Sequence, residues 1–257
     1  MWQTIKSYPH RHGQSSITLN ISRFPEMIGN VMQCSKCRYP AVVFQPYSGQ
    51  YLCRDHFVLD FEAKAKREIR KNRWMRPGDH IAVALTGSPG EGALLHFLSK
   101  LAANRTDLRI SAVQTGNAGR HAGPIPAGPG YTRLARATSL EERAASLLTS
   151  ILAGRGDRII TGDRADCGGI PEIFPFCHIP AEEILLYARI HDPGSTGSTP
   201  APEPGTLEGD VRALLDGYTR NHPGAPHAVL NLCDSLAGTL PDPDRPGRAG
   251  HEGASNS

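Results

Sequence analysis

The sequence predicts an α/β protein with a mainly parallel sheet, preceded by a small cysteine-rich module. Apolar, strand-like segments at residues 80–85 and 108–113 alternate with segments of helical periodicity at 92–104 and 139–154. Such alternation is typical of parallel sheets, whose strands are joined by crossover helices. Ahead of them, two cysteine or histidine pairs flank a short β-prone stretch, which predicts a metal-stabilised hairpin.

Length and composition set further bounds. The 257 residues suffice for one main domain with small attachments, and a formal net charge of +3 names no partner by itself. The chain has no apolar run of membrane-span length and no signal-peptide centre at its start, so we expect a cytoplasmic protein with no membrane partner. In such a protein the six cysteines favour metal binding over disulfides.

Composition divides the chain into seven segments. The leader, linker and tail are polar or rich in Gly, Pro and Ser, and such segments cannot bury a core. We expect a disordered leader at 1–31, a zinc-finger module at 32–58, a basic linking helix at 59–77, an α/β domain at 78–191, a flexible linker at 192–206, a C-terminal helical segment at 207–238 and a disordered tail at 239–257.

The elements of the first half follow from turns and periodicity. Phe57, Phe61, Ala65 and Ile69 recur every four residues, so one apolar stripe marks a helix that ends near residue 72. The turn PYSG between β-prone stretches predicts a hairpin. The expected elements are hairpin strands at 41–45 and 50–52, a turn at 76–79, a strand at 80–85, a helix at 92–104, a strand at 108–113 and a loop at 115–130.

Helix caps mark the second half. Ser139 and Glu142 have the spacing of a capping box, and Gly154 ends the helix that they begin. Residues 157–180 fit a strand or a loop, and both alternatives stay open. The other expected elements are a third strand within 131–138 and helices at 181–191 and 207–221.

The cysteine-rich module has metal-ligand spacing. Cys34-x2-Cys37 is followed, after fifteen residues, by Cys53-x2-His56. Each pair suits a turn that brings two side chains to one ion, and thiolate with imidazole in tetrahedral geometry is the set that zinc prefers. The set leaves no open position and has no adjacent base, so we expect a structural zinc ion on Cys34, Cys37, Cys53 and His56.

The helix after this module is strongly basic. Seven Lys or Arg residues lie between Phe61 and Arg76, against two glutamates, with Trp74 nearby. Such a surface can follow RNA phosphates, although a solvated helix face is an equal alternative. The residues that we expect to bind RNA are Lys64, Arg67, Arg70, Lys71 and Arg73.

The stretch HIAVALTGSPGEGALLHFLSKL, residues 80–101, combines a buried strand, a Gly-rich turn and an amphipathic helix. This arrangement offers backbone amides to a phosphate. It is not a Walker loop, because Ala93 and Leu94 stand where Lys and Ser or Thr are required. Pro89 likewise breaks the dinucleotide pattern G-x-G-x-x-G.

The order of these features resembles the tRNA 2-thiouridine synthetases of the PP-loop, or adenine nucleotide alpha-hydrolase-like, superfamily. LARATSLEERAASLLTSILAGRGD is similar to that family's ATGHNLDDEAxTxLMNxLRGD, FPFCHIPAEEILLYA to xPLxxIPEKEIxLYA, and YTRNHPGAPHAVLN to xxxxHPGxxxxLL. The resemblance covers most of residues 34–236. It implies tRNA as a partner and a PP-loop, Rossmann-like parallel sheet, here shortened because little chain separates the second strand from LARATSLEE.

Members of this family bind ATP, adenylate the C2 carbonyl of a tRNA uridine and deliver sulfur through catalytic cysteines, some with an iron–sulfur cluster. Their loop S-G-G-x-D-S falls on residues 86–91, where Pro89 removes an amide donor, Gly90 removes the Asp and Glu91 adds a negative charge. These changes argue against ATP as a cofactor. The resemblance leaves Thr86, Gly87, Ser88 and Glu141 as vestigial nucleotide-binding positions.

The cysteines also depart from the family pattern. Residues 114–135 and 191–206, where the family carries its catalytic cysteines, contain none. We interpret Cys167 and Cys177 as buried or loop residues, with a redox pair or ligands as the alternative, and Cys233 as a core residue. We therefore expect no catalytic residue, a structural zinc ion as the cofactor and no iron–sulfur cluster.

Three functions stay open. The first is a catalytically degenerate member of the tRNA thiolation family, whose reaction is the thiolation of wobble or T-loop uridines. It would be a tRNA-binding pseudoenzyme that partners an active synthetase or a sulfur-carrier protein. The second is an active ATP-dependent tRNA-uridine 2-sulfurtransferase with a divergent loop. The third is a zinc-containing regulator that binds other nucleic acids. We favour the first, because the loop substitutions and the missing cysteines are independent losses.

Overall fold

The structure, a computed structural model, describes residues 32–114, 130–155, 170–194 and 205–239. The chain divides into two compact units, Met1–Phe57 and Val58–Ser257. The expected leader, most of the expected linker and nearly all of the expected tail lie outside the described residues. Among the helices of these four ranges, none is long and apolar enough to cross a membrane.

The first unit contains the expected hairpin. Strand β1 (Val43–Gln45) pairs antiparallel with β2 (Gln50–Leu52). The rings of Phe44 and Tyr51 pack across the pair with centroids 4.6 Å apart. Gly49 closes the turn with a φ of 66°, a conformation that glycine adopts without a steric penalty.

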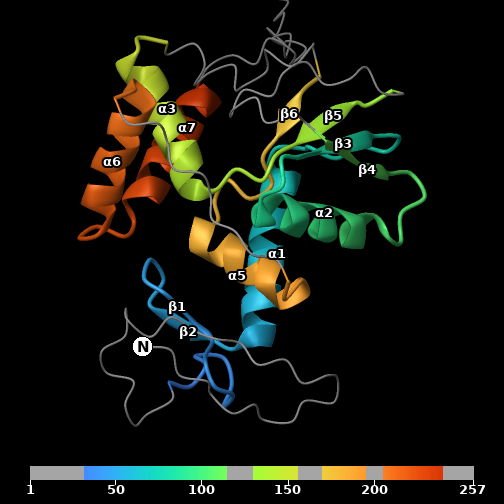
Figure 1. The fold of residues 1–257 in the computed structure, drawn as a ribbon, viewed down its shortest axis with the longest axis horizontal. Coiled ribbons are helices and arrows are strands. Elements are labelled where there is room, and N and C mark those ends of the chain that lie inside the picture. The colour runs from blue at the N-terminus through green and yellow to red at the C-terminus, as the bar shows by residue number, and fades with distance from the viewer. Residues whose placement is uncertain (1–31, 115–129, 156–169, 195–204, 240–257) are drawn as a thin grey trace, which may run out of the picture. The chain divides into compact units, whose positions relative to one another are not determined.

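The second unit is built on a parallel sheet, which confirms the predicted fold class (Figure 1). Its order is β4-β3-β5-β6, and each neighbouring pair is parallel. Residues 81–84 of the central strand are buried, as expected for a strand covered on both faces. The four strands are β3 (His80–Leu85), β4 (Arg109–Gln114), β5 (Arg133–Ala135) and β6 (Glu172–Ile173).

Six helices are described in these ranges. The helix after the Gly-rich turn begins at Pro89 rather than at residue 92, because Ser88 is its N-cap and proline is well tolerated in the first turn. The capping box of Ser139 and Glu142 is confirmed. The helices are α1 (Arg54–Lys71), α2 (Pro89–Ala102), α3 (Leu140–Leu152), α5 (Ala181–His191), α6 (Leu207–Thr219) and α7 (Ala225–Thr239).

Two apolar clusters hold the second unit together. Phe61 of α1 stacks on Tyr187 of α5 with ring centroids 4.1 Å apart, and both rings are fully buried. Helices α3, α6 and α7 pack on one another around Leu140, Leu215 and Cys233. Figure 1 shows these three helices as a separate group beside the sheet.

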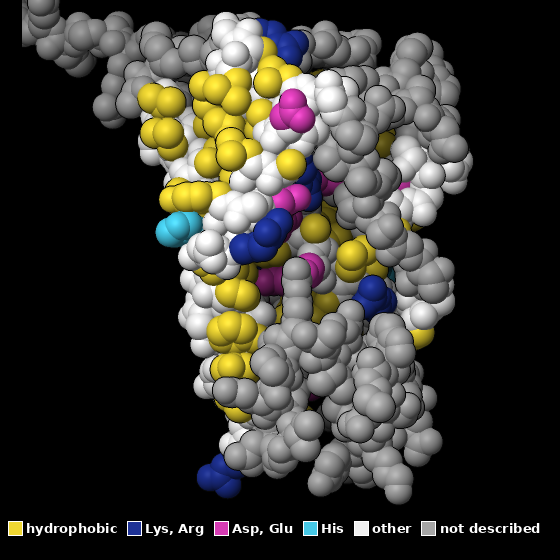
Figure 2. Space-filling view, turned by 60° about the vertical axis from the view of Figure 1, so that its left-hand side comes forward, with side chains coloured by type: hydrophobic (Ala, Val, Ile, Leu, Met, Phe, Trp, Pro, Cys, Tyr) yellow, Lys and Arg dark blue, Asp and Glu magenta, His cyan; other side chains and the backbone are white. Residues whose placement is uncertain are grey.

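The C-terminal helices also expose apolar side chains. Leu214 and Tyr218 of α6 are 65% and 56% exposed. Figure 2 shows hydrophobic side chains gathered on one face of the molecule, with Lys, Arg, Asp and Glu side chains beside and between them. This surface borders a groove lined by residues of α3, α6 and α7.

Candidate metal centre and nucleotide loop

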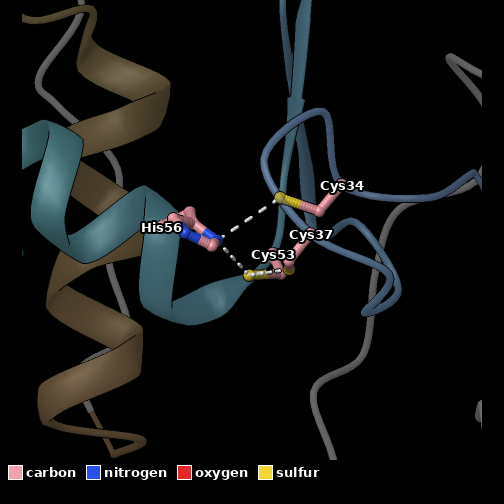
Figure 3. Close-up of side chains that lie close together, drawn as sticks. All are labelled: Cys34, Cys37, Cys53 and His56. Atoms are coloured by element: carbon pink, nitrogen blue, oxygen red, sulfur yellow. Dashed lines mark hydrogen bonds between the residues drawn. The ribbon is translucent and has the colours of Figure 1, made fainter.

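Four side chains of the first unit converge on one point (Figure 3). Cys34 and Cys37 come from the turn before the hairpin, whereas Cys53 directly precedes α1 and His56 lies in its first turn. Their ligand atoms all lie within 4.8 Å of one another. The two sequence pairs are thus brought together as predicted.

The distances in this group suit a single ion. His56 Nδ1 lies 3.6 Å from Cys34 Sγ and 3.2 Å from Cys53 Sγ, and the sulfurs of Cys37 and Cys53 are 3.7 Å apart. Tetrahedral zinc with ordinary bond lengths separates such atoms by roughly 3.6–3.8 Å. The backbone N–H of Lys36 points at Cys34 Sγ from 3.4 Å, as in a knuckle turn.

The local electrostatics also favour a cation. Burial acts to raise the pKa of Cys34, but backbone N–H groups of Cys53, Lys36 and Cys37 outweigh it and lower this pKa to about 6. Burial raises the pKa of Cys53 to about 11, and the neighbouring thiols of Cys37 and Cys34 act in the same direction. Ionisation of Cys53 beside an ionised Cys34 is therefore unfavourable until a metal ion is bound.

The Gly-rich turn between β3 and α2 forms an anion-binding nest, and a side chain of the protein fills it. The Glu91 carboxylate accepts hydrogen bonds from the backbone N–H groups of Thr86 at 2.5 Å, Gly87 at 3.0 Å and Ser88 at 3.1 Å. The Thr86 hydroxyl donates a fourth bond at 2.7 Å. Consecutive amides that converge in this way bind anions such as phosphate.

Local geometry explains why the turn has this form. Gly87 has a φ of 103°, which bends the chain sharply after β3. A Cβ atom on Gly90 would lie 3.3 Å from Ile184 Cγ2 and 3.7 Å from Ala137 Cβ. The absence of a side chain at position 90 therefore allows α2 to pack closely against α5.

Three of the four predicted nucleotide positions come together, and the fourth has another role. Thr86, Gly87 and Ser88 surround one anion position, but Glu91, rather than a ligand, occupies it. The Glu141 carboxylate accepts a hydrogen bond from the Ala181 N–H at the start of α5. Burial raises the pKa of Glu141.

Sequence reasoning treated Glu91 only as a repelling charge and missed its part in the loop. The missed signal is the spacing of Ser88 and Glu91, which is that of a capping box. In such a box the glutamate turns back onto the amides at the helix start.

The predicted RNA-binding residues fall into two groups. Lys64 lies 2.6 Å from Asp60 and 3.3 Å from Glu183, and Lys71 lies 2.5 Å from Asp234. By contrast, Arg67, Arg70 and Arg73 are exposed. The arginines thus remain accessible to phosphates, although Arg67 Nε lies 4.0 Å from Glu68, whereas the two lysines are engaged in closer ion pairs.

The remaining cysteines do not form a reactive site among the described residues. Cys177 and Cys233 are buried. Burial raises the pKa of Cys177 to about 12, so its thiol stays protonated and is a poor nucleophile at neutral pH. Cys167 lies outside the described residues.

Comparisons of sequence relate the chain to tRNA 2-thiolation proteins. The N-terminal LIM domain of the 2-thiouridine synthetase TtuA matches residues 33–58. The tRNA 2-thiolation protein NcsA of Haloferax volcanii is 23% identical over 281 aligned residues, which cover 80% of this chain and 87% of that protein. The tRNA-5-methyluridine(54) 2-sulfurtransferase of Thermus thermophilus is 34% identical over 79 residues; that match spans 31% of this chain and only 25% of the relative.

A solved structure shares the fold. The U34-tRNA thiolase NcsA from Methanococcus maripaludis matches with a TM-score of 0.64 at 15% identity, over 82% of this chain and 88% of that one. That thiolase holds a [4Fe–4S] cluster, so our expectation that an iron–sulfur cluster has no place here was wrong. The Cys34–His56 group itself has the spacing of ligands to one ion, since the ligands of a cluster bind different irons and lie further apart.

Proteins of tRNA 2-thiolation thus match the N-terminal module and the alignment over most of the chain, and the solved thiolase shares the fold. The N-terminal match covers the four clustered ligands, and the two NcsA matches cover 80% and 82% of the chain. This chain is therefore similar to the tRNA 2-thiolation proteins, both in its N-terminal module and, at 23% identity, over most of its length.

Proposed function

We propose that this chain is a tRNA-binding member of the family that serves as a partner subunit of an active synthetase rather than as the catalyst. One observation carries the proposal. The Glu91 carboxylate takes up three backbone N–H groups and one hydroxyl, the donors that a nucleotide phosphate would use.

Electrostatics strengthen this argument. The amides lie at the N-terminus of α2, where the helix dipole favours one negative group, and Glu91 supplies it. A polyphosphate would have to displace this carboxylate or bind beside it against like-charge repulsion. Pro89 additionally contributes no N–H at the first helical position.

An active adenylating enzyme is the second candidate, and one feature of the loop favours it. The N–H groups of Thr86, Gly87 and Ser88 still converge on a single point, and Glu91 is only half-buried. A change of the Glu91 rotamer would therefore vacate an intact nest. The relatives named as sulfurtransferases support this candidate too.

Calorimetric titration of ATP into the full-length chain separates the two candidates. We expect no saturable binding by the wild type and measurable binding by Glu91→Ser, which restores the hydroxyl of the family loop. Glu142→Ala is the matched control, because it removes a capping glutamate from α3 and leaves the nest unchanged. Saturable ATP binding together with ATP–pyrophosphate exchange by the wild type would establish the active enzyme instead.

Two further assignments belong to the proposal. The group of Cys34, Cys37, Cys53 and His56 holds one structural zinc ion, supported by its donor set and spacing. The exposed arginines of α1 contact the phosphates of tRNA. Co-purification of the tagged chain from its native cells tests the partner role: a full-length synthetase and tRNA should accompany it, and their absence would count against a partner subunit.

A further inference from the structure

A second group of metal-ligating atoms lies in the second unit, apart from the loop and from the N-terminal cysteines. Glu68 of α1 and the adjacent residues Cys177 and His178 each offer one ligand atom, and these atoms lie within 4.8 Å of one another. The donors are one carboxylate oxygen, one sulfur and one imidazole nitrogen. Neither the family resemblance nor the proposed function accounts for this group.

The backbone holds two of the three donors in a fixed turn before α5. The Cys177 N–H donates to the Phe174 carbonyl at 3.0 Å, and the Ile179 N–H donates to the Phe176 carbonyl at 2.8 Å. Phe176 is fully buried against Phe61 of α1. The turn is therefore anchored to the same helix that supplies Glu68.

The separations suit an ion better than direct hydrogen bonds. His178 Nε2 lies 3.6 Å from Glu68 Oε2 and 3.6 Å from Asp234 Oδ2. A hydrogen bond would bring nitrogen and oxygen to about 2.9 Å. A nitrogen and an oxygen that bind the same tetrahedral zinc ion lie roughly 3.4 Å apart, a little closer than pairs that include sulfur.

Burial and charge also favour a cation. Glu68 and Cys177 are 4% and 7% exposed, and only 12% of the His178 side chain is exposed. Lys71 pairs with Asp234, and the Glu68 carboxylate faces both the His178 imidazole and the exposed Arg67 guanidinium, whose Nε lies 4.0 Å away. A divalent ion with ionised Cys177, ionised Glu68 and neutral His178 would make the centre electrically neutral.

We infer that Glu68, Cys177 and His178 form a second metal site, which takes a divalent ion of the zinc or cobalt class. Sulfur, nitrogen and oxygen donors together match the ligand preferences of these ions. Three protein ligands leave a fourth position for water or for Asp234. Binding deprotonates Cys177 and releases its proton to solvent, so that no oxidant or reductant is needed.

Metal content of the full-length chain tests this inference. After reconstitution with zinc and removal of free metal, we expect two zinc ions per chain in the wild type and one in Cys177→Ser. Cys233→Ser, which changes another buried cysteine of the same unit, should retain two. Reconstitution with cobalt(II) should give a thiolate charge-transfer band that weakens in Cys177→Ser, because the thiolate ligands fall from four to three.

A competition titration of the wild-type chain against a chromophoric zinc chelator decides the question without any variant. Two stoichiometric steps support the second site, and one step overturns it. Glu68→Gln and His178→Gln provide readouts if Cys177→Ser does not fold. Zinc content that stays at two in these folded variants would also contradict the assignment.

Discussion

Glu91 Oε2 lies 2.5 Å from the backbone nitrogen of Thr86, so the side chain of α2 turns back onto the last residues before its own helix. The same oxygen accepts from Gly87 and Ser88. The loop is thus an anion-binding site whose anion is built into the chain. Whether a phosphate can replace this carboxylate decides between the two candidate functions.

Glu91→Ala should destabilise the second unit and create a site for inorganic anions. Loss of a capping carboxylate costs about 1 kcal/mol of unfolding free energy. Sulfate should then raise the melting temperature of Glu91→Ala more than that of the wild type, because it binds only the folded variant's vacant amides. Thermal melts over a sulfate series measure this difference.

Glu142→Ala is the control for that experiment. Glu142 caps α3 through one N–H, that of Ser139, so its loss should cost a similar amount of stability. It opens no nest of three amides, and sulfate should not rescue it. Equal sulfate responses in both variants would mean that the Glu91 nest is no special anion site.

Cys53→Ser should remove the metal of the first unit and loosen its hairpin. Cys53 contacts both His56 and Cys37, so its loss breaks the group at its centre. Small metal-stabilised modules unfold without their ion. Limited proteolysis should therefore cut within residues 32–57 in this variant and in chelator-treated wild type, but not in Cys233→Ser. Protection of these residues in metal-free protein would contradict a structural role for the ion.

Substitution of Glu62 should lower the unfolding free energy more than substitution of most other polar residues. The Glu62 carboxylate, 6% exposed, accepts from Lys66 at 3.1 Å, Lys100 at 2.5 Å and the Tyr187 hydroxyl at 3.2 Å, and so joins α1, α2 and α5. Glu62→Ala should lower the unfolding free energy by roughly 2 kcal/mol in urea denaturation, because it leaves the buried Tyr187 hydroxyl without its acceptor. Lys66→Ala, at the exposed end of the cluster, should cost under about 1 kcal/mol. Similar losses in both variants would refute the central position of Glu62.

Arg67 and Arg70 should carry tRNA binding, whereas Lys64 should not. Arg67→Ala and Arg70→Ala should each weaken tRNA binding and reduce the slope of log affinity against log salt by about one. Lys64→Ala removes a cation that is paired with Asp60 and Glu183, so it should lower stability and leave tRNA affinity unchanged. Filter binding over a salt series measures these effects. A preference for duplex DNA over tRNA at matched salt would support the regulator instead.

Local patterns predicted much of this fold, and tertiary contacts determine the rest. The strand His80–Leu85, the capping box at Ser139 and the pairing of Cys34 and Cys37 with Cys53 and His56 depend on neighbours in sequence. The engagement of Lys64 by Glu183 does not, because these residues meet only when α1 and α5 pack. Likewise, the tight contact that a side chain at position 90 would make is with Ile184, far along the chain.

Protonation of Asp79 in acid should lower the unfolding free energy of the protein. The Asp79 carboxylate accepts from the Arg76 N–H at 2.7 Å, the Thr132 hydroxyl at 2.9 Å and Arg133 Nε at 2.9 Å. Burial acts to raise the pKa of Asp79, but these donors outweigh it and hold the pKa below its ordinary value of 3.8. The unfolded chain therefore takes up the proton first, so the stabilisation is present above the ordinary pKa and is lost as pH falls through the lower folded pKa. Asp79→Asn should lower the unfolding free energy by roughly 2 kcal/mol at neutral pH and flatten this acid dependence, as measured by urea denaturation. The control is Asp107→Asn, at a surface ion pair with Arg105, which should leave the unfolding free energy at neutral pH nearly unchanged. An acid dependence as steep in Asp79→Asn as in the wild type would assign it to other carboxylates.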